Sequence, residues 1–114
     1  MSYTKRMLKL AARVSRLKKD DRRYYLGAVA QRSDGIIVYA QNGSPPEPCA
    51  EHHCEFRLTR KLNKRSTVYL ARTIANGVWA NSRPCRACQI AMKSIKVKEI
   101  YYTVGPNQFG CLRL

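Results

Sequence analysis

Long apolar runs are missing from this sequence. It has no stretch of about 18 apolar residues, the length that a membrane-spanning helix needs. Residues 1–6 lead into a charged segment and lack the apolar core of a secretory signal. The five cysteines are an odd number and cannot all pair, so a disulfide framework is not expected. We therefore expect one domain over 1–114, without a membrane partner, in the cytoplasm, or in a host's cytoplasm if the source is a virus.

Acidic residues are also scarce. Seven Asp and Glu stand against 22 Lys and Arg, which gives a formal net charge of +15. Such an excess favours contact with a polyanion or steering of an anionic substrate. A merely solubilising surface is the alternative, and the charge alone does not decide between them.

Two short motifs carry the chemistry of the chain. The first is His53-Cys54-Glu55, and the second is the P-C-x-x-C stretch that begins at Pro84 and contains Cys85 and Cys88. One imidazole and two thiolates suit tetrahedral Zn²⁺ with its fourth position left to water. The two cysteines stand at i and i+3, so a helix beginning near Cys85 points both to one side. The combined pattern H-x-E…P-C-x-x-C is the signature of zinc deaminases.

Glu55 is placed for acid–base work. Zinc lowers the pKa of a bound water from 15.7 towards roughly 7, which supplies a nucleophile at neutral pH. A carboxylate two residues past His53 reaches that water without binding the metal. It can take the water proton and deliver it to the ring nitrogen and the leaving ammonia.

Two alternative arrangements are open to these residues. In a closed structural zinc site, His52, Cys49 or Cys54 would supply a fourth ligand, but Glu55 would then have no use. Cys49-Ala50-Glu51 also reads as ligand-x-Glu, the form used by small tetrameric cytidine deaminases. Helical periodicity favours Glu55, because apolar Leu58 and Leu62 follow it at i+3 and i+7.

Hydrophobic periodicity and turn signals predict the elements. Helices are expected over 5–18, 53–63 and 85–94, and strands over 24–31, 36–41, 67–74, 97–104 and 109–114. Asp34-Gly35 favours a hairpin between the first two strands. The link 105–108 is too short for a crossover, so the last strand returns antiparallel. We predict an α/β fold of three layers, with a mixed five-stranded sheet, helices on both faces, and both metal-bearing helices on one face.

The order of elements and the motifs resemble the cytidine deaminase superfamily from Tyr24 onward. The runs 68–72, 81–88 and 95–102 look like those of the CMP/dCMP deaminase group. The resemblance implies a cytidine-deaminase-like fold. It also implies that zinc is bound by His53, Cys85 and Cys88, and that Glu55 moves protons.

The resemblance also suggests substrate contacts. Asn42 would touch the sugar, although it is equally a turn residue, and the backbone N–H of Cys54 would bind the activated water or base. We place four residues beside the metal at the substrate as well: Trp79, Ser82, Arg83 and Pro84. For Trp79, packing is an equally simple role. Cys54 departs from the family, which often has a small residue there.

Three functions follow from this pattern. The first is hydrolytic conversion of cytosine to uracil in single-stranded DNA or RNA. It is motivated by the charge, by the basic helices expected at 5–18 and 57–65, and by the aromatic residues Trp79, Tyr101 and Tyr102. The second is deamination of free CMP, dCMP or cytidine, favoured by the small size and by a closing antiparallel hairpin like that of the free-nucleoside branch. The third is a non-catalytic zinc module that binds nucleic acid. Homo-oligomers, common among relatives, would need neutralised interfaces at this charge.

Overall fold

The computed structural model describes residues 2–16, 24–41, 61–74 and 77–114. Eight elements follow one another in this part of the chain: α1 (Tyr3–Ser15), β1 (Tyr24–Gln31), β2 (Ile37–Gln41), β3 (Thr67–Ile74), β4 (Trp79–Ala80), α3 (Arg86–Ser94), β5 (Glu99–Gly105) and β6 (Gln108–Leu112). The predicted helix over 53–63 lies mostly outside the described residues. No described helix is long and apolar enough to cross a membrane.

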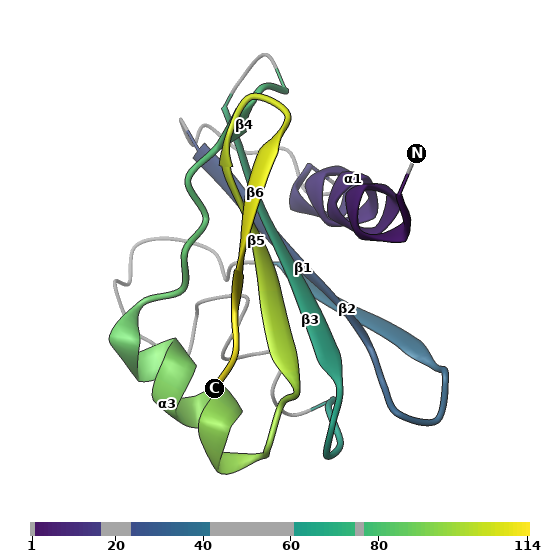
Figure 1. Ribbon diagram of the computed structural model, residues 1–114. Coiled ribbons are helices and arrows are strands. Elements are labelled where there is room, and N and C mark those ends of the chain that lie inside the picture. Colours follow the sequence, from purple (N-terminus) through teal and green to yellow (C-terminus); the bar gives the residue numbers. More distant parts are fainter. Residues whose placement is uncertain (1, 17–23, 42–60, 75–76) are drawn as a thin grey trace.

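The strands form one mixed sheet with α1 on one face and α3 on the other (Figure 1). The main path of the sheet is β2-β1-β3-β5-β6, and β4 pairs with β3 beside this path. All pairs are antiparallel except β3 with β5, which α3 connects. The three-layer prediction and the antiparallel closing hairpin are therefore confirmed.

The prediction of five strands was one short, because the two-residue strand β4 was missed. Its pairing depends on a tight turn in which Gly77 has a φ of 85° and its N–H donates to Ile74 O at 2.8 Å. The turn brings Trp79 opposite Thr73 of β3. Two residues are too few for the alternating pattern that predicts a strand.

Helix α1 starts earlier and ends earlier than the predicted 5–18. The Ser2 side chain accepts a hydrogen bond from Lys5 N at 3.2 Å and so caps the first turn. The helix buries Leu8 and Ala11 completely, whereas Leu10 is only partly buried.

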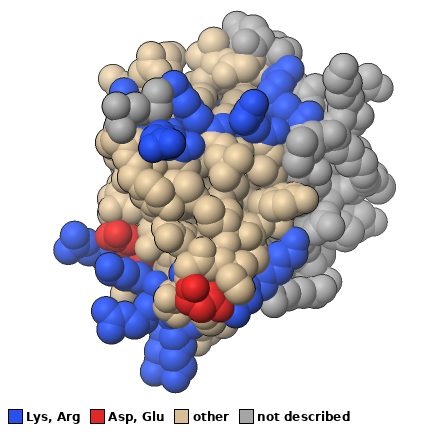
Figure 2. Space-filling model, turned by 90° about the vertical axis from the view of Figure 1, so that its right-hand side faces the viewer, with Lys and Arg blue, Asp and Glu red and all other residues tan. Residues whose placement is uncertain are grey.

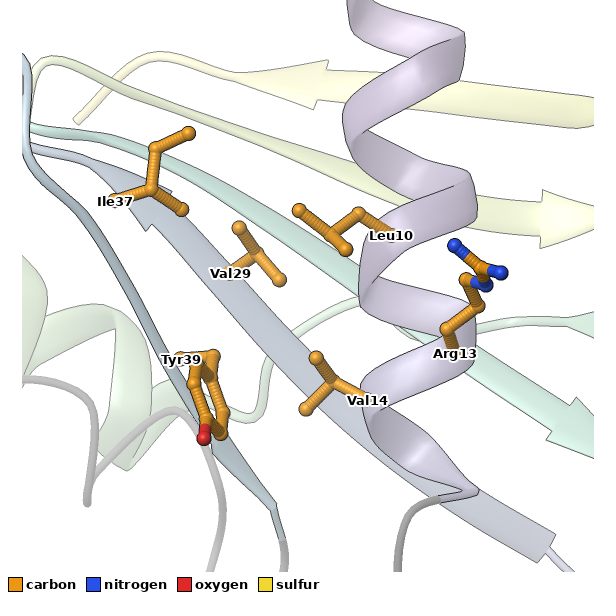
Figure 3. Close-up of a pocket in the computed structure, with 6 residues that line it drawn as sticks. All are labelled: Leu10, Arg13, Val14, Val29, Ile37 and Tyr39. Carbon is orange, nitrogen blue, oxygen red and sulfur yellow. The ribbon is translucent and has the colours of Figure 1, made fainter.

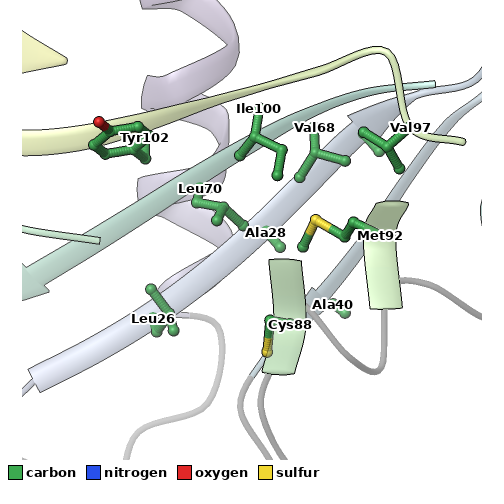
Figure 4. Close-up of a cluster of buried hydrophobic side chains, with 11 residues drawn as sticks. Leu26, Ala28, Ala40, Val68, Leu70, Cys88, Met92, Val97, Ile100 and Tyr102 are labelled. Carbon is green, nitrogen blue, oxygen red and sulfur yellow. The ribbon is translucent and has the colours of Figure 1, made fainter. Parts of the chain in front are cut away.

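The sheet separates two hydrophobic cores. The core on the α3 side, shown in Figure 4, combines side chains of the sheet with Cys88 and Met92 of the helix, both fully buried. The core on the α1 side contains Met7, Leu8, Ala11 and Val14 of the helix with Val29, Tyr69 and Ala71 of the sheet. Alternate residues of each strand thus enter different cores, as the two-residue period of a strand requires.

A shallow groove lies on the α1 side, between that helix and the edge strand β2 (Figure 3). Its volume is about 450 Å³, and it is lined by Leu10, Arg13, Val14, Val29, Ile37 and Tyr39. Cys88 belongs to the core on the other face of the sheet. The groove is therefore separated from the cysteine motif by the sheet.

Candidate metal centre and its surroundings

The two cysteines of the P-C-x-x-C motif mark the start of α3. Cys85 is the N-cap residue with an exposed side chain, and Cys88 lies one turn later, fully buried against the sheet. The first turn of α3 contains no acidic residue. The positive end of the helix dipole therefore lies at the sulfurs without a carboxylate in that turn.

The stretch before the helix is held by Gln89. Its side-chain Nε2 donates to Pro84 O at 2.8 Å, and its backbone N–H donates to Cys85 O at 3.0 Å. Pro84 itself is buried. Hydrogen bonds to the carbonyl of Pro84 and to that of Cys85 thus hold the backbone at Cys85 without a metal.

This arrangement fits two of the predicted zinc ligands. Sulfurs one helical turn apart, at a helix N-terminus, match the donor chemistry of Zn²⁺. Within the described residues, no group of three or more His, Cys, Asp and Glu side chains comes together. His53, Cys54, Glu55 and Asn42 lie outside these residues, so their roles stay predictions.

The rival ligand-x-Glu motif, Cys49 with Glu51, lies outside the described residues too. The choice of His53 over Cys49 therefore stays a prediction that rests on helical periodicity.

A buried hydroxyl pair anchors the segment that leads to the cysteines. Ser82 is 2% exposed and Thr103 is fully buried. Ser82 N donates to Thr103 O at 2.8 Å, and its hydroxyl donates to Leu70 O at 3.0 Å. Thr103 Oγ1 lies 2.9 Å from Ser82 Oγ and donates to Ala80 O at 2.7 Å.

Ser82 and Thr103 lie where strands β3 and β5 stop pairing with each other. The parallel ladder between β3 and β5 ends at Leu70 and Tyr102, and β3 then pairs with β4. Ser82 and Thr103 lie directly beyond the last of these pairs, at the carboxyl end of the parallel ladder. Ligand sites of open α/β sheets are found at such ends. The structure thus gives Ser82 a scaffold role, and its predicted contact with the substrate stays a prediction.

Thr103 was not among the predicted site residues. A threonine in a β-branched strand reads as an ordinary strand residue. Only its burial beside Ser82 gives it a role in positioning the cysteine segment.

Replacing Thr103 with valine is expected to destabilise this anchor while keeping the volume of the side chain. The Arg72 N–H, which donates to Thr103 Oγ1 at 3.2 Å, and Ala80 O would both lose this hydroxyl. We expect a loss of about 1–3 kcal/mol in the free energy of unfolding, together with lower zinc occupancy. Thr103→Ser keeps the hydroxyl and should restore both. Urea denaturation and zinc analysis measure the effects, and wild-type values for Thr103→Val would contradict the role.

Trp79 and Arg83 lie in different surroundings. Trp79 packs against the core on the α1 side, which is the packing role rather than a place beside Cys88. Arg83 is exposed, and its guanidinium lies over the ring of Tyr102 at 5.9 Å from the centroid. Gly110 gives this ring room, since a Cβ there would lie 2.8 Å from Tyr102 Oη. Arg83 therefore presents a positive charge two residues before Cys85.

Raised pKa values occur in an aromatic and acidic cluster on strands β3, β5 and β6. Burial, aided by Tyr3 and Tyr101, raises the pKa of Tyr69 to about 12. Burial is also the main cause of the raised pKa of Tyr101, whose hydroxyl donates to Glu99 at 3.0 Å, and of the raised pKa of the Cys111 thiol. Tyr69 belongs to the core on the α1 side, where its ring stacks on that of Tyr101 at 5.5 Å. The raised pKa values keep these groups protonated at neutral pH, and they result mainly from burial in the fold.

Comparison with known proteins identifies the class. The family model of the cytidine and deoxycytidylate deaminase zinc-binding region matches residues 1–104. The chain therefore belongs to this family of zinc-dependent hydrolases, and its cofactor is Zn²⁺. The family assignment agrees with the resemblance inferred from the two motifs. No curated protein matches the chain significantly.

Solved structures show the same fold. Cytidine deaminase from Burkholderia pseudomallei superposes with a TM-score of 0.71 at 15% identity, covering 99% of this chain and 93% of the other. The Mycobacterium leprae enzyme gives 0.62 at 16% identity, covering 97% and 94%. The Mycobacterium tuberculosis enzyme gives 0.57 at 20% identity, covering 90% and 85%. At these identities the likeness concerns the fold.

Proposed function

We propose that this deaminase converts cytosine to uracil in single-stranded DNA or RNA. Membership of the family supports action on a cytosine-type substrate. The observation that carries the finer proposal is the charge, +15 with 22 Lys and Arg. A mononucleotide engages only a few cations, whereas a polynucleotide can use many of them.

The surroundings of Cys85 suit such a substrate. Arg83 and Arg86 are both exposed on either side of the cysteine, and Tyr102 lies beneath the Arg83 guanidinium. Guanidinium groups bind phosphate oxygens, and their flat faces stack on bases. A nucleotide whose base enters the metal site could therefore place a neighbouring phosphate or base against Arg83.

The proposed reaction assigns each predicted residue one task. His53, Cys85 and Cys88 would hold the zinc, which supplies an activated water at neutral pH when bound. Glu55 would accept a proton from that water and pass it to the ring nitrogen as C4 is attacked. The same carboxylate would then take the proton of the new hydroxyl on C4 and deliver it to the amino group, so that the C4–N bond breaks, ammonia leaves and uracil remains.

Deamination of free CMP, dCMP or cytidine is the second candidate. The observation in its favour is the short hairpin of β5 and β6, which closes the sheet with an antiparallel strand. The resemblance associates this closure with enzymes of the free-nucleoside branch. A non-catalytic zinc module is the third candidate, and Glu55 has no use in it.

A substrate comparison tests the proposal. We expect the purified zinc-loaded protein to form uracil in single-stranded oligonucleotides with a higher kcat/KM than on cytidine, CMP or dCMP. Phosphate contacts outside the metal site would add binding energy only for the polymer. Uracil is measured by mass spectrometry, with the same oligonucleotide annealed to its complement as the control. Turnover of the monomers alone would overturn the polynucleotide proposal and establish the second candidate.

A further inference from the structure

A second basic surface lies at the other end of α3 from Cys85. Five exposed cations surround the place where parallel strands β3 and β5 begin: Lys64, Arg65, Lys93, Lys96 and Lys98. We call this set the turn patch. In Figure 1 the end of α3 and the starts of these strands lie at the lower end of the sheet, and Figure 2 shows Lys and Arg gathered at that end.

Backbone hydrogen bonds hold the members of the turn patch together. Arg65 N donates to Lys96 O at 2.9 Å, and Lys98 N donates to Ser66 O at 2.9 Å. Lys96 N donates to Lys93 O at 3.0 Å. The segments around Arg65 and Lys96, some thirty residues apart in the sequence, are therefore joined by backbone hydrogen bonds. These bonds make residues of like charge neighbours.

Within the part of the chain that the structure describes, carboxylates do little to neutralise this patch. The ion pairs found among the described residues are Arg32 with Asp34 and Arg113 with Glu99, and neither involves a member of the patch. Glu99 follows Lys98 in the chain, but it accepts the hydroxyl hydrogen of Tyr101 and faces Arg113. Among residues 2–16, 24–41, 61–74 and 77–114, no ion pair thus relieves the repulsion between the five cations, which an external anion would relieve.

Two members of the patch occupy backbone positions that usually favour glycine. Lys96 has a φ of 59° and Arg65 has a φ of 66°. Lys96 follows the C-cap Ile95, and Val97 N donates to Met92 O at 3.1 Å, which is the Schellman pattern. Glycine is the commonest residue there because a side chain is disfavoured at positive φ. The chain carries long cationic side chains at both positions despite this cost.

We propose that the turn patch binds the phosphate backbone of single-stranded nucleic acid, remote from the base being deaminated. This inference rests on the proposed function and names where the remainder of the substrate lies. The eleven positions from Cys85 to Lys96, mostly in α3, correspond to a rise of about 16 Å along the helix. A mononucleotide at Cys85 does not extend to Lys96, whereas a longer strand can follow the helix.

The positive φ angles allow an unusually clean test. Changing Arg65 and Lys96 together to glycine removes two cations and relieves the backbone, so thermal stability should be unchanged or higher. The control Arg6→Gln with Lys9→Gln removes the same charge from exposed positions on α1. Binding of a fluorescent thymine-only or uracil-only oligonucleotide is followed by anisotropy over a range of salt concentrations.

The glycine pair should weaken binding roughly tenfold and flatten the slope of log affinity against log salt by about 1.4, which corresponds to about 0.7 for each phosphate that is no longer neutralised. The control pair should have a clearly smaller effect. Equal effects of the two pairs, no effect of the glycine pair, or wild-type binding to anionic phosphatidylserine vesicles but not to the oligonucleotide would each overturn the proposal.

Catalysis separates this inference from the proposed function. Turnover of CMP should be unchanged in the glycine pair, because the patch lies beyond the reach of a mononucleotide. If the protein deaminated only monomers but still bound the oligonucleotide through the turn patch, the proposed function would be wrong. The proposed role of the turn patch would then still hold. Oligonucleotide deamination that the glycine pair leaves intact, with normal binding, would defeat the patch alone.

Discussion

Glu55→Gln is expected to lower kcat for cytosine deamination by a factor of about 10²–10⁴ or more while zinc stays bound. General acid–base groups contribute rate factors of this size. Glutamine keeps the shape of the side chain but can neither accept nor return a proton. Because the metal ligands are untouched, zinc content measured by atomic spectroscopy should equal that of the wild type.

Glu51→Gln is the matched control, since it makes the same chemical change at the rival glutamate. It should retain most of the activity. If Glu51→Gln were inactive and Glu55→Gln active, Cys49 would replace His53 in the metal site. If both variants kept full activity, neither carboxylate would be the proton carrier. Loss of zinc with Glu55→Gln would instead point to Glu55 as a ligand.

Gly27→Ala is expected to cause the largest loss of stability from a single methyl group. Gly27 lies in β1 directly beneath α1, and a Cβ there would meet Ala11 O and come within 2.5 Å of Ser15 N. Both are backbone atoms and cannot turn away as a side chain would. The helix would have to lift from the sheet and open the core around Leu8 and Val29. Overpacking typically costs about 1–3 kcal/mol, and a rigid obstacle places this site at or above the upper end.

Gly105→Ala makes the same change at a glycine of β5 where space is available. The nearest atom to a Cβ there is Gln108 Oε1 at 3.6 Å, an ordinary contact. Its stability should stay within about 0.5 kcal/mol of the wild type, as for most surface substitutions. Urea denaturation compares the two variants. A Gly27→Ala protein as stable as Gly105→Ala would show that α1 is not seated on β1 in this way.

Several local features were predictable because they depend on neighbours in the sequence. The runs 24–31 and 67–74 coincide with β1 and β3, and Asp34-Gly35 does form the hairpin turn, with Gly35 at a φ of 88°. The helix after the P-C-x-x-C motif was predicted to within one residue. These elements follow from alternation, helical spacing and turn residues, which act within a few positions.

Other features depend on segments that are distant in the sequence. The place of Trp79 is one of them: pairing of β4 with β3 directs it to the core on the α1 side, which is the packing role that the sequence left open beside a substrate contact. Thr103 gains its role only where β3 and β5 separate beside Ser82. No local pattern specifies which strand a two-residue segment will join, because the energy comes from the partner strand.

The class of this protein was predictable from its two short motifs. His53, Glu55, Cys85 and Cys88 are recognisable by type and spacing, because zinc chemistry restricts which side chains can serve and how far apart they lie on a helix. The anchoring of the segment before Cys85 and the set of cations that become neighbours depend instead on how distant segments pair. Arg65 and Lys96 meet because two parallel strands start side by side, and parallel pairing joins residues that the chain keeps far apart.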